Sequence, residues 1–297
     1  MTKRLRIIGA ASGLGAQDRR CADGPVAFHR SQAWHELERH PDIDWGRTLF
    51  PPDGAGLSAP KRVSALCGDL AGEVELALRE GDFPLVIGGD HSVAVGTWSG
   101  VARLAGAPVG LLWVDAHLDS HTPETSYSGA LHGMPLACLF GRGDRRLLGF
   151  GIAGAQLDPA HVAVVGPRSF EPEEAALLER LGVRVFGQAE IEARGTDDCF
   201  AEAAAIVSGA PAGFGVSLDL DVLDPGTAPG VGSPEPDGLS VGGVLRGLAT
   251  VAARGGLRAF EIVEYNPDRD RHGLTARLIA GIIAEVLPFV SGSGGRP

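Results

Sequence analysis

The chain has 297 residues, of which 44% are hydrophobic and 21% are charged, a composition typical of a soluble globular protein with a sizeable core. Its formal net charge of -11 disfavours a nucleic-acid or anionic-membrane surface, because both require a clustered basic face. We therefore expect a small-molecule partner.

The cysteines and the N-terminal residues indicate in which cellular compartment the protein is expected. The 4 cysteines lie far apart and show no C-x-x-C spacing, so the sequence predicts neither a zinc ribbon nor a disulfide framework. Residues 1–8 lack the long apolar core of a signal peptide, and no apolar run reaches membrane-spanning length. We expect a soluble cytoplasmic protein, with one domain over residues 1–290 and a flexible tail at residues 291–297.

The N-terminal part of the chain alternates between predicted strands and helices. A strand at residues 5–8 leads into a glycine-rich loop at residues 9–15, which lacks the glycine spacing of a dinucleotide-binding fingerprint. Helices are predicted at residues 25–40, opened by a proline, and at residues 60–79, where apolar residues recur at helical spacing. A buried strand follows at residues 83–87. This alternation indicates an α/β fold with a parallel sheet.

The apolar run at residues 109–114 has the pattern of a strand that is buried on both faces. It is followed at once by Asp115, His117 and Asp119. If the backbone stays extended here, these side chains point the same way, because they are spaced by two. One strand end would then present two carboxylates and an imidazole to one point.

Two further strand ends carry residues of the same kind. The strand at residues 83–87 leads into Gly-Gly-Asp-His-Ser, where the glycines allow a sharp turn that brings His91 inward. The strand that begins at residue 213 ends with Asp219 and Asp221, again spaced by two. Burial of either carboxylate without a cation would be costly.

The polar loop at residues 120–133 follows a ligand-bearing strand, a place where loops usually carry function. Its chemical candidates are His121, Ser126, Ser128 and His132.

The second half of the chain continues the alternation. The last predicted strand, at residues 257–263, ends in Glu264, and Ser233 lies in a loop rich in proline and glycine. The other predicted elements are a strand at residues 162–165 and helices at residues 172–181, 241–254 and 274–287.

Open α/β sheets place their sites at the carboxyl ends of the strands, so these candidates should meet at one edge. Four carboxylates so close would repel one another unless about two divalent cations were present. Oxygen-rich ligation with two imidazoles suits Mn(II) better than structural zinc, while iron, cobalt and nickel remain open. Two such ions can share one water and lower its pKa, for attack on a trigonal carbon or a phosphorus. The six candidate ligands are His91, Asp115, His117, Asp119, Asp219 and Asp221.

The three strand ends resemble, in the same order, the metal-binding signatures of the ureohydrolases, the arginase and agmatinase family. They are Gly-Gly-Asp-His-Ser at residues 88–92, Asp-Ala-His-Leu-Asp at residues 115–119 and Ser-Leu-Asp-Leu-Asp-Val-Leu-Asp-Pro at residues 217–225. The likeness runs from the glycine-rich first loop to the last helix. It implies a three-layer α/β/α fold around an eight-stranded parallel sheet, assembly as a trimer or hexamer, and hydrolysis of a guanidino group to urea and an amine at a dimanganese centre.

The resemblance also implies individual roles. His132 would shuttle a proton, Glu264 would pair with the guanidinium group, and Asp119 would belong to the catalytic group as well as to the metal site. One metal would be bound by His91, Asp115, Asp119 and Asp219, and the other by Asp115, His117, Asp219 and Asp221.

Within the family, residues 122–133 resemble the arginase branch. Ser128 falls on a serine that binds the substrate carboxylate, and Glu171 stands where arginases usually have an aspartate for the α-amino group. Two positions depart from the pattern, because His121 replaces a carboxylate-binding asparagine and Ala130 replaces another asparagine. The residues expected to bind substrate are His121, Ser126, Ser128, Glu171, Ser233 and Glu264.

We therefore expect hydrolysis of L-arginine to ornithine and urea, with agmatine, guanidinobutyrate and hydroxyarginine as alternative substrates. A dimetal phosphoesterase would also use D-x-H, but it needs later G-N-H-[DE] and G-H-x-H motifs that this chain lacks. An inactive metal-binding homologue would lack ligands, and none of the six is missing.

Overall fold

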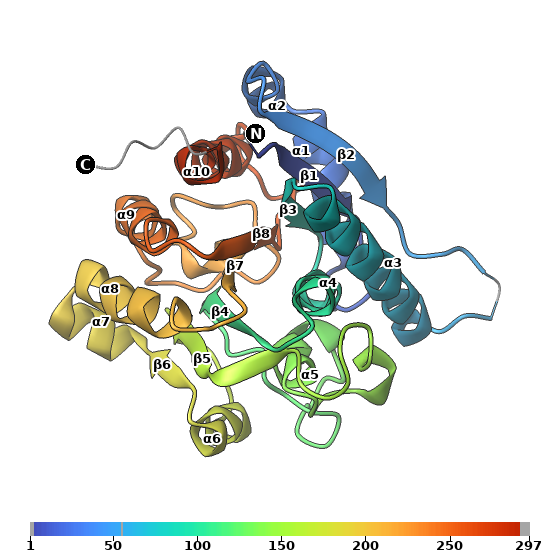
Figure 1. The fold of residues 1–297 in the computed structure, drawn as a ribbon, viewed down its shortest axis with the longest axis vertical. Helices are drawn as coiled ribbons and strands as arrows, with labels where there is room; N and C mark the ends of the chain where they lie inside the picture. The colour runs from blue at the N-terminus through green and yellow to red at the C-terminus, as the bar shows by residue number, and fades with distance from the viewer. Residues whose placement is uncertain (1–2, 55, 292–297) are drawn as a thin grey trace.

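The computed structural model describes residues 3–54 and 56–291, and its centre is one eight-stranded, all-parallel sheet in the order β2-β1-β3-β8-β7-β4-β5-β6 (Figure 1). The strands are β1 Leu5–Ala10, β2 Ile43–Leu49, β3 Phe83–Gly88, β4 Val109–Val114, β5 Leu157–Val165, β6 Arg184–Phe186, β7 Phe214–Asp219 and β8 Leu257–Val263. The α-helices are α1 Gly24–His29, α2 Gln32–Leu37, α3 Ala59–Arg79, α4 Ala94–Ala105, α5 Pro135–Leu139, α6 Pro172–Leu181, α7 Gln188–Arg194, α8 Thr196–Val207, α9 Val241–Ala252 and α10 Leu274–Ser291. Short 3-10 helices are η1 Arg19–Asp23, η2 His91–Val93, η3 Leu131–Gly133, η4 Arg145–Leu147 and η5 Leu220–Val222.

Helices cover both faces of the sheet, as Figure 1 shows. Side chains alternate along each strand, so Leu112 of β4 packs in one core with α8, α9 and α10, while its neighbour Trp113 packs in a second core with α3 and α4. The predicted three-layer α/β/α fold with an eight-stranded parallel sheet is confirmed.

In the N-terminal part, one prediction is wrong in detail and one strand was not predicted. The structure has two short helices in place of the one expected over residues 25–40. The first, α1, ends at His29, and the Ser31 hydroxyl accepts a hydrogen bond from the Trp34 amide at the start of α2. The edge strand β2 was not predicted. Among its residues only Ile43 and Leu49 are buried, so it lacks the apolar alternation of an inner strand.

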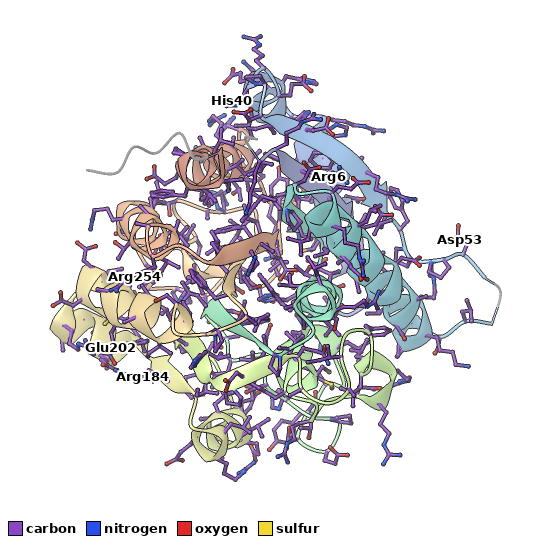
Figure 2. The ribbon with its side chains drawn as sticks, in the orientation of Figure 1. Arg6, His40, Asp53, Arg184, Glu202 and Arg254 are labelled. Carbon is purple, nitrogen blue, oxygen red and sulfur yellow. The ribbon has the colours of Figure 1, made fainter. Side chains whose placement is uncertain are left out.

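The opposite edge of the sheet also contains elements that the sequence did not predict, namely β6, α7 and α8. Arg184 of β6 lies over the ring of Phe186, 3.9 Å from its centroid, and its Nε is 3.0 Å from a Glu202 oxygen on α8. Figure 2 shows the Arg184 and Glu202 side chains together at this periphery. The charged side chains cover an edge strand that would otherwise invite pairing with another chain.

Gly215 of β7 lets helix α4 approach the sheet. A Cβ atom at this position would lie 1.8 Å from Cζ3 of the fully buried Trp98. We expect Gly215→Ala to destabilise the fold by about 1–3 kcal/mol or more, since the indole has no room to move. Calorimetric unfolding of the variant and the wild type would measure this loss of stability.

Gly281→Ala is the matched control, because nothing lies within 4 Å of a Cβ there. It should raise stability by roughly 0.5–1 kcal/mol, since alanine favours a helix interior over glycine. Equal melting temperatures for the two variants would contradict this account of Gly215.

The C-terminal boundary differs slightly from the expectation. Helix α10 includes residue 291, the first residue of the predicted tail, and residues 292–297 lie outside the described residues. Within residues 3–54 and 56–291, no helix has the length and apolar character needed to cross a membrane.

Candidate metal centre

The sheet order brings the three predicted motifs together. Strands β3, β8, β7 and β4 are neighbours in the middle of the sheet and run parallel, so their carboxyl ends share one edge (Figure 1). His91 follows β3, Asp115 follows β4, Asp219 ends β7 and Glu264 follows β8. Residues that are far apart in sequence therefore meet at one site.

An aspartate turns the chain at two of these strand ends. Oδ1 of Asp115 accepts a hydrogen bond from the His117 amide at 2.7 Å, and Oδ1 of Asp219 accepts one from the Asp221 amide at 2.9 Å. Each turn leaves the second oxygen, Oδ2, facing His91. The same carboxylate thus shapes the turn and offers an atom to a metal.

The condition of an extended backbone beyond β4 is not met. The strand ends at Val114, residues 115–119 bend, and Asp119 has a φ of 46°. Aspartate tolerates this left-handed conformation better than most residues. The Asp119 side chain therefore reaches the site from a turn and not through the alternation of a strand.

The first cluster surrounds His91. Its Nδ1 lies 3.2 Å from Asp115 Oδ2, 3.0 Å from Asp119 Oδ2 and 3.2 Å from Asp219 Oδ2. This nitrogen is buried and has no hydrogen-bond partner among the described residues. A buried nitrogen without a partner that faces three carboxylates fits a metal ligand, because an ion between them would satisfy all four groups.

The second cluster surrounds His117. Its Nδ1 lies 3.0 Å from Asp221 Oδ2 and 3.4 Å from Asp115 Oδ1. Asp115 therefore belongs to both clusters through its two oxygens. A carboxylate shared in this way could serve two adjacent metal ions.

The charges at the site also favour cations. Burial, followed by the charges of Asp221 and Asp115, raises the pKa of Asp219 well above its ordinary value. Burial and the charge of Asp115 likewise raise the pKa of Asp119 to about 6. Ionising all these carboxylates together is costly, and two divalent ions would balance their charge.

Three residues that we did not single out from the sequence hold the first cluster in place. The Ser217 hydroxyl lies 2.9 Å from His91 Nε2 and donates to the Glu261 carboxylate at 2.7 Å. The Trp113 ring stacks on His91 at 4.1 Å, and its indole N–H donates to Asp115 Oδ2 at 2.8 Å. Such outer partners fix the orientation of ligands. A glutamate inside the apolar last strand was the available sequence signal for Glu261.

His132 and Glu264 form a pair beside the metal clusters. His132 Nδ1 lies 3.1 Å from Glu264 Oε1, which also accepts a hydrogen bond from the His91 amide at 3.0 Å. Burial alone would lower the pKa of His132, but the hydrogen bond to Glu264 and the charge of that carboxylate outweigh it and raise the pKa to about 9. The imidazole is therefore held with its proton at neutral pH.

A cavity of about 360 Å³ opens onto these groups. Of the residues expected to bind substrate, His121, Glu171, Ser233 and Glu264 line it, together with His132 and four of the metal-cluster residues, His117, Asp119, Asp219 and Asp221. Ser126 and Ser128 lie on the adjoining loop but are not among the lining residues described. The role of these two serines stays a prediction.

The fold and the two clusters together define a three-layer α/β protein with a candidate binuclear metal centre at the carboxyl edge of its sheet. Comparison with known proteins gives the family. A model of the Arginase family matches residues 3–288, and the chain belongs to this family. The family implies a binuclear metal site, for which the two clusters are the candidates.

Individual relatives agree with this assignment. The chain is 35% identical over 294 residues to an arginase from Bacillus caldovelox, covering 96% of this chain and 98% of that protein. It is 37% identical over 294 residues to an arginase from Brevibacillus brevis, with the same coverage. The solved structure of the Bacillus caldovelox arginase superposes with a TM-score of 0.88, at 33% identity over 96% of this chain and 98% of that chain.

Proposed function

We propose that this chain is a binuclear manganese ureohydrolase that hydrolyses the guanidino group of L-arginine, or of a close guanidino compound, to urea and an amine. The observation that carries the proposal is the pair of histidine and carboxylate clusters that share Asp115. Membership of the arginase family supports the reaction class. Oxygen-rich ligation with two imidazoles favours Mn(II) over zinc, with cobalt, nickel and iron as the alternatives.

The two clusters would hold two divalent cations, which would supply a water of lowered pKa for attack on the trigonal guanidino carbon. Side chains of the protein orient the substrate and supply a proton to the leaving amine. Glu264 offers a buried carboxylate to the planar guanidinium cation, which such groups recognise by charge-assisted hydrogen bonds. His132 holds a proton that the leaving amine needs, because an amide anion is too basic to depart.

The direct test is urea release by manganese-loaded protein from L-arginine, agmatine, guanidinobutyrate and hydroxyarginine. We expect urea from L-arginine or from one of its close analogues. If no guanidino compound yields urea while the protein binds two metals per chain, the proposed reaction is wrong.

Glu264→Gln tests the assigned orientation of the substrate. We expect the variant to stay folded and metal-loaded but to lose most of its kcat/KM, because the neutral amide cannot pair with the guanidinium charge. Urea release beside metal analysis would measure this. Native kcat/KM in this variant would show that the guanidinium group binds elsewhere.

We also propose one domain over residues 1–290, a homo-oligomer, either a trimer or a hexamer, and a cytoplasmic location. A sheet whose strands come from Leu5 to Val263 supports the single domain. The family resemblance supports the oligomer. Four buried free cysteines support a reducing compartment.

A further inference from the structure

The two histidines of the candidate metal centre differ in what contacts the far side of the ring. Each turns Nδ1 toward the carboxylates of its own cluster, which leaves Nε2 for another partner. Nε2 of His91 lies 2.9 Å from the Ser217 hydroxyl, which donates to Glu261. Nε2 of His117 lies 3.7 Å from Oε1 of Glu235. Glu235 thus stands beside His117 where Ser217 and Glu261 stand beside His91.

The chemistry of imidazole gives the Glu235 contact a purpose. A metal ion on Nδ1 of His117 fixes the ring proton on Nε2, because a neutral imidazole carries one N–H. That N–H then faces the Glu235 carboxylate. A carboxylate in this place orients the ring and makes its metal-binding nitrogen a better donor. At 3.7 Å it acts through its charge or through one bridging water, because a direct hydrogen bond is shorter.

The sequence around Glu235 restricts the loop that carries it. Glu235 lies between Pro234 and Pro236. Each proline fixes its own φ, and Pro236 also confines Glu235 to extended conformations. The unfolded chain therefore has less backbone freedom to lose when the loop brings this carboxylate to the metal centre.

Arg168 ties this loop to the second cluster. Its Nη2 donates to the Asp221 carbonyl at 2.7 Å and to the Glu235 carbonyl at 2.9 Å, and its Nε donates to the Pro236 carbonyl at 2.8 Å. One guanidinium group therefore joins the backbone of a candidate metal ligand to the backbone that presents Glu235. Its planar and rigid donor geometry suits it to hold two segments at a fixed spacing.

We propose that Glu235, held in place by Arg168, supports His117 from the far side of its ring and strengthens the binding of the metal ion at the second cluster. Glu235 is not among the described residues that line the cavity, so it acts through His117 and is a positioning residue. This inference rests on the binuclear centre of the proposed function.

Titration of the metal-free protein with Mn(II) tests the proposal without reference to activity. Calorimetry, together with the magnetic resonance signal of free Mn(II), gives the dissociation constants of the two ions. We expect Glu235→Gln to raise one of them about tenfold and to leave the other unchanged. Loss of such a partner costs roughly 10–100-fold in metal affinity, and the low end applies because both side chains are partly exposed, His117 at 25% and Glu235 at 30%.

Asp237→Asn is the matched control for the charge. Asp237 is exposed, lies two residues further along the same loop and has a φ of 60°, which asparagine adopts readily. This variant loses the same negative charge, and it should keep both wild-type dissociation constants. An equal loss of affinity in the two variants would show that only the overall charge of the loop attracts the ion, and the proposal would be wrong.

Thermal unfolding separates support of the metal ligand from support of the fold. Without metal, Glu235→Gln should melt at the wild-type temperature, because its side chain is partly exposed. With Mn(II), it should gain less stability than the wild type, since an ion that binds more weakly stabilises the folded state less. A lower melting temperature without metal and an equal gain with Mn(II) would give Glu235 a purely structural role.

Arg168→Lys tests the part assigned to Arg168. It should also weaken the binding of one ion, because lysine cannot bridge the two segments in the same way. Arg168 contacts Asp221 directly, so the informative quantity is the coupling between the two substitutions. Arg168→Lys should cost less affinity when Glu235→Gln is already present. Purely additive losses would show that Arg168 does not act through Glu235.

The results distinguish this inference from the proposed function. If the wild type binds fewer than two ions per chain, both fail. If the wild type binds two ions and releases urea while Glu235→Gln binds both ions as tightly, the proposed function stands and the role of Glu235 is wrong.

Discussion

Replacement of Asp221 by Ala should reduce urea release by orders of magnitude and lower the metal content of the protein. The Asp221 carboxylate is 1% exposed, and its Oδ2 lies 3.0 Å from His117 Nδ1. Its loss therefore removes a candidate metal ligand and one of the two carboxylates that face the His117 ring. We expect the effect to exceed the roughly 10–100-fold that loss of an outer hydrogen-bond partner costs. Metal analysis and urea release from the same preparation would measure it.

Asp224→Ala is the control for this experiment. Asp224 is three residues further on and accepts a hydrogen bond from the Gly226 amide in a turn, outside both clusters. It should keep its metals and most of its activity. If Asp221→Ala retained native turnover with one metal or none per chain, a binuclear mechanism would be excluded.

A parallel substitution at Asp119 should use asparagine. The backbone there has a φ of 46°, which asparagine adopts readily, whereas alanine would add conformational strain to the loss of the ligand. Asp119→Asn thus removes the negative charge while it keeps the turn.

Replacement of His132 by Asn should remove most of the turnover number while two metals stay bound. His132 belongs to neither metal cluster, and its proton is needed by the leaving amine. Loss of a general acid typically costs about 10²–10⁴-fold. Added imidazole should restore part of the rate. Native turnover at neutral pH would remove His132 from the mechanism and make His121 the next residue to test.

The pH profile provides a second measurement of the same role. A donor whose pKa is about 9 stays protonated at neutral pH, so turnover should fall as the pH rises through that value. The charge and hydrogen bond of Glu264 raise this pKa. The residual activity of Glu264→Gln should therefore decline at a lower pH than that of the wild type.

Much of the site could be predicted from sequence because its ligands follow buried strands. Apolar runs before Asp115 and Asp219 predict strands, and parallel strands deliver their ends to one edge. The bend at residues 115–119 could not be predicted in this way, because spacing by two suggests an extended chain. This turn is set by the hydrogen bond that the Asp115 carboxylate accepts from the His117 amide, as Asp219 accepts one from the Asp221 amide after β7, and periodicity does not report such bonds.

Contacts between segments that are distant in the sequence were harder to predict than the ligands at the strand ends. The bond between His121 and Glu171 joins a loop to the start of α6, and no local pattern reports their proximity. The same is true of Ser217 and Glu261, which meet because β7 and β8 pair in register. Edge elements such as β2 escaped prediction because only their ends are buried, so their apolar signal is weak.

The place of β8 has a consequence for biosynthesis. This strand, the last of the described sheet to be synthesised, lies between β3 and β7 in the middle of the sheet (Figure 1). Before it emerges from the ribosome, β2-β1-β3 and β7-β4-β5-β6 have no strand to join them. His91 belongs to the first part and the aspartate ligands to the second, so the nascent chain cannot assemble the first metal cluster until translation has passed residue 263. We therefore expect the first cluster to be completed late, whereas Asp115, His117 and Asp221 of the second cluster all precede β8 in the chain.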